Sequence, residues 1–175
     1  MSRVIYAHMS AVIEAPEAAT ALPQEDVVET YLRERGKPMP GAEHAICQMR
    51  LGYQFMLAGT HIVFSELNLD LNGLRSIPDL CVYRRDQEAQ VRNRIWVNEV
   101  PQIAVEIISP SQTLEEMGTR IDSLLNSGVP SVWLVIPFAR VISVYQKGIP
   151  LFSITTGILT DPATGIAVNV DEVFA

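Results

Sequence analysis

Positive charge is scarce in this chain. Its 13 Lys and Arg residues stand against 20 Asp and Glu residues, which gives a formal net charge of −7. Because contacts to nucleic-acid phosphates come mainly from Lys and Arg, this balance argues against broad electrostatic binding of DNA or RNA. The clearest local surplus is the stretch 84–94, RRDQEAQVRNR. Its arginines are candidate nucleic-acid contacts, with a solvated loop as the alternative: Arg84, Arg85, Arg92 and Arg94.

Cysteine is also rare, and long apolar runs are missing. Cys47 and Cys81 lie in apolar surroundings, which favours two buried, reduced thiols over a disulfide. No apolar run approaches the roughly 18 residues of a membrane span. The first residues, MSRVIYAHMSAVIEAP, lack the pattern of a signal peptide. We therefore expect a cytoplasmic protein with no membrane partner.

Apolar residues make up 48% of the 175 residues, and charged residues make up 19%. This composition suits a globular core, so we expect an N-terminal arm over 1–22 and one domain over 23–175. Pro23 predicts the first turn of a helix that ends near Arg35, before Gly36. A second helix is predicted over 42–58. Its apolar residues recur at helical spacing: Ile46, Met49, Tyr53, Met56 and Leu57.

The next segment changes to the period of a strand. Within 61–71, apolar Leu67, Leu69 and Leu71 alternate with polar residues, which predicts a half-buried strand. Asn72-Gly73 predicts a two-residue hairpin turn. A second strand over 77–83 is then expected to pair antiparallel with the first. The run QIAVEIIS at 102–109 is apolar almost throughout and predicts a central strand buried on both faces.

A helix is predicted over 114–126, because Thr113 and Glu116 have the spacing of a capping box and Gly128 can end the helix. The buried strand VWLVI follows, so the helix forms a right-handed crossover between two parallel strands. VISVY, SITTGIL and IAVNV predict further outer strands. The fold class is therefore α/β, with a mixed sheet in the order α-β-β-β-α-β and extra C-terminal strands.

Two acidic residues stand out because their neighbours are apolar. Glu106 lies inside AVEII, and Asp79 begins the strand in IPDLCVY. An unpaired carboxylate costs several kcal/mol to bury, so each needs a cation or another partner. Paired carboxylates on adjacent strands suit Mg²⁺ or Mn²⁺. The alternative is structural: Asp79 caps a turn, and Glu106 pairs with an arginine.

Two further residues are candidates for the same site. Glu66, in FSELNL, is either a third metal ligand or a residue of the polar face of its strand. His44 begins the second predicted helix, with Gln48 one turn later on the same side. His44 either contacts a phosphate or leaving group, or it is a surface residue.

The residues PDLCVY, VEIISPSQT and GVPSVWLVIP, in this order and spacing, resemble the Uma-two family of restriction-endonuclease type. The resemblance covers about residue 27 to the end of the chain. It implies the PD-(D/E)XK nuclease superfamily, with its restriction-endonuclease-like core. Asp79 then matches the PD motif, and Glu106 matches the acid of the (D/E)XK motif.

The resemblance also exposes a departure. The lysine of the superfamily would stand at Ile108, and the family's lysine on the following helix is replaced by Arg120. The only lysines of the chain are Lys37 and Lys147. Arginine stays protonated and is a poor proton shuttle, but it can bind a phosphate. Its competing role is an ion pair with Glu116, one turn earlier.

These observations predict an Mg²⁺- or Mn²⁺-dependent endonuclease that hydrolyses DNA and forms a homodimer. Asp79 and Glu106 would hold the metal with help from Glu66, and Arg120 and His44 would complete the catalytic set. The alternative is a catalytically degenerate module that keeps the nuclease fold and binds nucleic acid or protein. The missing lysine and the acidic net charge favour this alternative.

Overall fold

The computed structural model describes Glu29, Thr30, Arg33 and residues 39–175. The chain divides into two compact units, Met1–Lys37 and Pro38–Ala175. In the first unit, the three described residues are helical, as expected within the predicted helix 23–35. The rest of that helix and the predicted arm 1–22 lie outside the described residues. The arm-to-domain boundary stays a prediction.

The second unit is built on a six-stranded sheet with the strand order β1-β4-β5-β6-β7-β8. β5 and β6 are parallel, and every other neighbouring pair is antiparallel. The central strand is therefore β5, as predicted, and all of its residues are buried. The strands are β1 (His61–Ser65), β4 (Leu80–Arg84), β5 (Ile103–Ile107), β6 (Ser131–Ile136), β7 (Val141–Gln146) and β8 (Ile149–Ile154).

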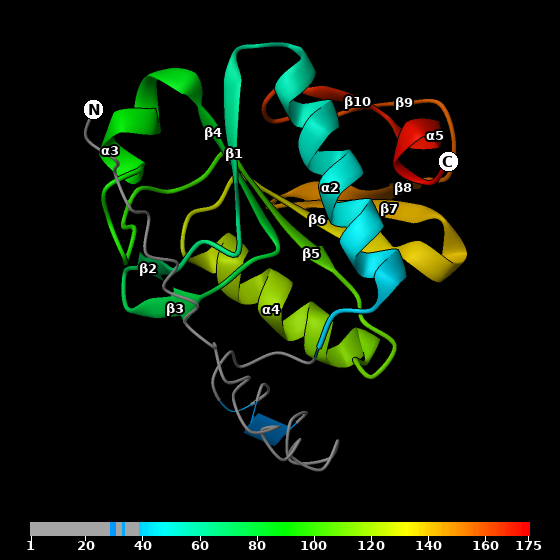
Figure 1. Cartoon of the computed structure of the whole chain (residues 1–175), viewed down its shortest axis with the longest axis horizontal. Coiled ribbons are helices and arrows are strands. Elements are labelled where there is room, and N and C mark those ends of the chain that lie inside the picture. Colours follow the sequence, from blue (N-terminus) through cyan, green and yellow to red (C-terminus); the bar gives the residue numbers. More distant parts are fainter. Residues whose placement is uncertain (1–28, 31–32, 34–38) are drawn as a thin grey trace, which may run out of the picture. The chain divides into compact units, whose positions relative to one another are not determined.

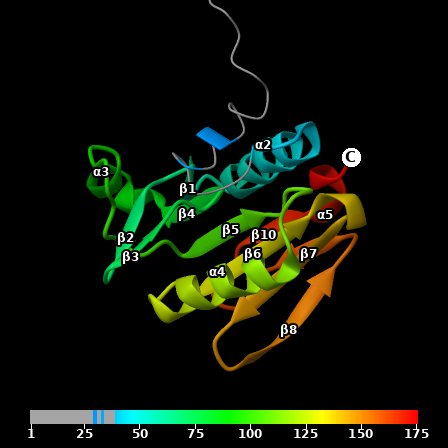
Figure 2. The same ribbon diagram turned by 90° about the horizontal axis from the view of Figure 1, so that it is seen from below.

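Two helices cover the two faces of this sheet (Figure 1). α2 (Ala42–Leu57) packs on one face through Cys47, Leu51 and Phe55. α4 (Leu114–Asn126) packs on the other face, as the view along the sheet shows (Figure 2). Alternate strand residues supply the two cores, so the apolar runs of β5 and β6 serve both faces at once.

α4 connects the parallel strands β5 and β6, which confirms the predicted crossover. The helix begins with the predicted capping box: Thr113 Oγ1 accepts the Glu116 N–H at 3.2 Å, and the Thr113 N–H donates to Glu116 Oε2 at 2.8 Å. Gly128 follows the helix at φ +105°, where a side chain would be strained.

The predicted strand pairing between 61–71 and 77–83 is wrong in part. The chain leaves β1 at Ser65, and Glu66 has φ +54°, which breaks the strand. The Asn72-Gly73 turn joins a separate small hairpin, β2 (Leu69–Leu71) and β3 (Leu74–Ser76). The antiparallel pairing itself is confirmed, because β4 pairs with β1. The hairpin is thus an insertion between two sheet strands.

The second predicted helix exists, but the apolar residues that identified it in the sequence face outward. Ile46, Met49, Tyr53, Met56 and Leu57 are all exposed. The buried face of α2 carries a different set: His44, Cys47, Leu51, Gly52 and Phe55. Both sides of the helix are therefore largely apolar.

The C-terminal segments complete the unit. β9 (Ile158–Thr160) and β10 (Ala167–Asn169) pair with each other instead of extending the main sheet, and α5 (Val170–Val173) follows. Asp161 anchors this part: its buried carboxylate accepts hydrogen bonds from Ser131 Oγ, from Trp133 Nε1 at 2.9 Å and from the Thr164 N–H at 2.8 Å. Over the described residues, no helix has the length and apolarity to cross a membrane.

Candidate active site

Three acidic residues lie side by side at one end of the sheet. Glu66 follows β1, Asp79 precedes β4, and Glu106 lies near the end of β5. The register pairs Ser65 with Leu80, and Leu80 with Val105, so the next positions bring Glu66, Asp79 and Glu106 to the same level. The Glu66 N–H donates to the Asp79 carbonyl at 3.2 Å.

Asp79 is buried and held from three sides. Its Oδ2 accepts the backbone N–H of Ile107 at 2.6 Å, and its Oδ1 lies 3.4 Å from His44 Nε2. Gln48 Nε2 donates to its backbone carbonyl at 2.9 Å. Through its carboxylate and its backbone carbonyl, Asp79 thus joins β4, β5 and the first two turns of α2.

Glu106 is 2% exposed and is held by the helix on the other face. Nη2 of Arg120 donates to both carboxylate oxygens of Glu106, at 2.9 and 3.0 Å. The competing ion pair with Glu116 is absent from the described contacts of Arg120, because Glu116 is engaged in the capping box. Hydrogen bonds from the backbone and side chain of Thr113 lower the pKa of Glu116.

Arg120 is a permanent cation in this site. Burial disfavours its charge, but attraction to Glu106, then to Asp79 and Glu66, outweighs burial and raises the pKa of Arg120 above its ordinary value. It therefore cannot act as a proton shuttle near neutral pH. Its Nε is buried and has no hydrogen-bond partner among the described residues. That N–H is a donor in need of an acceptor.

His44 is buried, which excludes the alternative that it is a surface residue. Its Nδ1 lies 3.3 Å from Ser109 Oγ, and its Nε2 faces Asp79. The Ser109 N–H donates to Gln112 Oε1 at 2.9 Å, which fixes the turn after β5. Ser109 was not a predicted site residue. Its one sequence signal is its place in VEIISPSQT, directly after the buried strand.

The acidic residues of this site suit a magnesium ion that is held by few protein ligands. Asp79 and Glu106 offer carboxylate oxygens, the ligands that Mg²⁺ prefers. Among the described residues, however, no group of three or more His, Cys, Asp or Glu side chains is arranged to hold a metal. Mg²⁺ is often held by only one or two carboxylates, with waters and a substrate phosphate as the other ligands. Asp79 and Glu106 fit this arrangement, in which the described part of the chain supplies two carboxylates and no closed cage of ligands.

The arginines of the predicted nucleic-acid patch do not join this site. Arg84 ends β4 at the edge opposite Asp79, about 16 Å away for five residues of strand. Each of these arginines has a local partner. Arg84 pairs with Asp86, Arg85 donates to the Gly59 carbonyl, Arg92 pairs with Glu88, and Arg94 pairs with Glu99. Their role in binding DNA stays a prediction.

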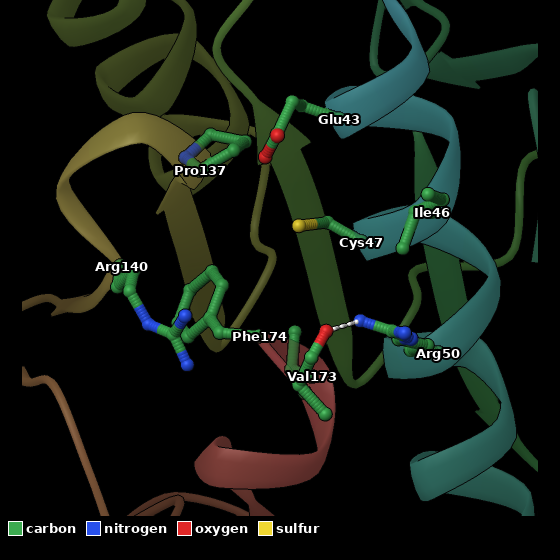
Figure 3. A pocket seen from close by; sticks show the side chains of 9 residues that line it. Glu43, Ile46, Cys47, Arg50, Pro137, Arg140, Val173 and Phe174 are labelled. Carbon is green, nitrogen blue, oxygen red and sulfur yellow. Dashed lines mark hydrogen bonds between the residues drawn. The ribbon is translucent and has the colours of Figure 1, made fainter.

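A cavity of about 230 Å³ lies beside α2, at η2 (Pro137–Ala139) and α5 (Figure 3). Cys47 and Glu43 line it, whereas Asp79, Glu106 and Arg120 do not. Burial raises the pKa of the Cys47 thiol, which keeps it protonated and unreactive. The cavity is therefore separate from the carboxylate site.

A family model named Uma2 and described as "Putative restriction endonuclease" matches residues 17–164. The chain is similar to a crystal structure of a protein from Anabaena variabilis, described as "a putative nuclease belonging to DUF820". The identity is 20%, the TM-score is 0.68, and the alignment covers 79% of this chain and 83% of that chain. This likeness confirms the predicted fold.

The chain is also similar, at 14% identity and a TM-score of 0.43, to part of the cryo-electron-microscopy structure of a DrdV–DNA complex. That alignment covers 74% of this chain and 11% of the other. A comparison with curated proteins found no match.

Proposed function

The chain belongs to the Uma2 family of restriction-endonuclease type, and we propose that it is a metal-dependent endonuclease that hydrolyses phosphodiester bonds of DNA. One observation carries the proposal. Two buried carboxylates, one directly before β4 and one in the neighbouring β5, lie beside an arginine whose buried Nε–H has no partner among the described residues. A phosphate oxygen is an acceptor that suits this donor.

Each residue of the site then has a distinct role. Asp79 and Glu106 would hold Mg²⁺ or Mn²⁺, with Glu66 as a further oxygen ligand at the same level. When bound, the metal supplies Lewis-acid stabilisation of charge on the phosphate and lowers the pKa of water. Arg120 binds a phosphate oxygen through Nε and stabilises negative charge that develops there. Electrostatic stabilisation of this kind is compatible with a guanidinium that never releases its proton.

His44 is better placed to position Asp79 than to touch the substrate. It is buried between Ser109 and Asp79 and therefore has little access to a bound strand. We propose that it fixes the orientation of the Asp79 carboxylate. In that role, His44→Gln weakens metal binding but recovers much of the rate at saturating metal, whereas Asp79→Asn keeps its large loss of rate at any metal concentration.

Cleavage of supercoiled plasmid in the presence of Mg²⁺ or Mn²⁺ tests the catalytic assignment. We expect Asp79→Asn and Glu106→Gln each to reduce the rate about 100-fold or more, because each removes a charged metal ligand without a change of shape. Glu115→Gln is the matched control, since Glu115 is an exposed acid at the start of α4. Cleavage that survives in both site variants contradicts the assignment.

The degenerate module remains the second candidate, and one observation favours it. Nη2 of Arg120 donates to both carboxylate oxygens of Glu106, so the two residues can serve as a structural ion pair. Titration calorimetry with Mn²⁺ separates the two functions. A nuclease binds Mn²⁺ in the wild-type chain and loses that binding in Glu106→Gln. A module of this kind releases no binding heat in either protein.

A further inference from the structure

The outward face of α2 carries an apolar stripe that the fold leaves exposed. Its members have exposed fractions between 44% and 75%: Ile46, Met49, Tyr53, Met56 and Leu57. They lie on the side of the helix opposite to Cys47, Leu51 and Phe55, which enter the core. The stripe therefore contributes nothing to the packing of the sheet.

The size of this stripe is unusual for a surface without a function. If each side chain has an ordinary area of roughly 200 Å², the exposed part amounts to about 600 Å². Monomeric proteins rarely expose more than a few hundred Å² of contiguous apolar surface. Two copies of this surface would bury roughly 1,200 Å², which reaches the lower limit of stable protein–protein interfaces.

The spacing of the stripe identifies the kind of partner. Residues 46, 49, 53 and 56 alternate in steps of three and four, which is the a/d pattern of a helix that packs along another helix. No charged residue belongs to the stripe. A second copy of α2 offers the same seam, and a two-fold axis makes such a contact self-complementary.

We propose that the protein forms a homodimer in which the two α2 helices pack antiparallel along this stripe. The axis lies midway between Met49 and Tyr53, so Met49 of one chain meets Tyr53 of its partner, and Ile46 meets Met56. The antiparallel direction brings opposite ends of the two helix dipoles together. It also keeps the Glu43 carboxylates of the two first turns apart. The inference does not depend on the proposed nuclease activity.

Sedimentation velocity of the full chain measures the proposed state. We expect a species of twice the 19.4 kDa chain mass, in a monomer–dimer equilibrium that depends on concentration. Met49→Glu places a charge in the seam and should weaken the dimer at least about 100-fold. Phe138→Glu is the control, because Phe138 is an exposed apolar residue outside α2 and should leave the dimer intact.

Disulfide crosslinking tests the direction of the helices. An equal mixture of Met49→Cys and Tyr53→Cys chains should form the mixed disulfide, while the buried Cys47 and Cys81 stay reduced. A wild-type chain that remains monomeric contradicts the proposal, including the case in which residues 1–37 of the same chain cover the stripe. A dimer that Met49→Glu leaves unchanged contradicts it equally. Plasmid cleavage by a monomeric Met49→Glu chain would leave the nuclease proposal standing.

Discussion

Glu106 and Arg120 form an ion pair that is deeply buried on one side only. Glu106 is almost inaccessible, whereas the Arg120 side chain is 27% exposed. Removing one member of such a pair leaves a charge without compensation, which costs more than the pair contributes as a whole. The same contact that stabilises the fold therefore also holds the guanidinium beside the acidic residues. Under the proposed function, the stability of the fold and the binding of phosphate are therefore coupled at Arg120.

Arg120→Met should lower the free energy of unfolding by about 3 kcal/mol, because it strands the Glu106 carboxylate. The double variant Arg120→Met with Glu106→Gln should recover most of this loss, since neither charge remains. Urea unfolding, followed by circular dichroism, measures the free energy of unfolding of each variant. If the losses of stability in Arg120→Met and in Glu106→Gln simply add up to the loss in the double variant, the two residues are not coupled.

At the scale of elements, α4 is the best-specified segment of the molecule. Its start, its end and its buried face all agree with local rules of capping and periodicity. The helix has a positional role, because it carries Arg120 across the end of the sheet to Glu106. The capping box of Thr113 and Glu116 determines the residue at which this helix begins.

Thr113→Ala should cost about 1 kcal/mol of stability, because the Glu116 N–H loses its acceptor. The capping box also makes a contribution that depends on pH. The pKa of Glu116 is lower in the folded chain than its ordinary 4.5, so its contribution is present above pH 4.5 and is lost as the pH falls through the folded pKa. Thermal unfolding of the wild type and of Thr113→Ala, measured across this pH range, should show that their difference in stability shrinks at low pH. A difference that grows on acidification contradicts the assignment.

The hairpin β2–β3 is a second element with a local signature. Gly73 has φ +87°, which is unfavourable for any residue with a side chain. Gly73→Ala should therefore destabilise the chain by about 1 kcal/mol, although open space surrounds the position. Because the hairpin lies between Glu66 and Asp79, metal affinity measured by calorimetry should fall as well. If Gly73→Ala has the same free energy of unfolding as the wild type, the backbone at this position is not strained.

For the whole molecule, the charge distribution limits how the proposed DNA substrate can be bound. The net charge is −7, and the four arginines of residues 84–94 already pair with local acids or carbonyls at the end of β4 away from the site. Binding should therefore depend on few phosphate contacts. It should need a divalent cation to offset the repulsion between the acidic protein and DNA.

The salt dependence of DNA binding tests this view. Replacing Arg84, Arg85, Arg92 and Arg94 with alanine should change the slope of log K against log salt by less than about one unit, when measured by fluorescence anisotropy with Ca²⁺. Four genuine phosphate contacts would change the slope by nearly four units. A large change would restore the patch as the DNA surface.

Elements with local signals could be predicted from the order of the amino acids alone. The capping box at Thr113, the Asn72-Gly73 turn and the apolar runs of β5 and β6 depend on residues within one turn or one strand, so their patterns survive without knowledge of the rest. Buried acids in apolar strands likewise marked Asp79 and Glu106, because burial of charge demands a reason.

Which residues contact one another across the sheet could not be predicted from local patterns. The stripe on α2 has the spacing of a core face, yet Cys47, Leu51 and Phe55 fill the core instead, because a helix with two apolar sides can present either one to the sheet. The pairing of Arg120 with Glu106 rather than Glu116, and the burial of His44 between Asp79 and Ser109, depend on contacts across the sheet. Such contacts join residues far apart in the chain, and no local pattern encodes their distance.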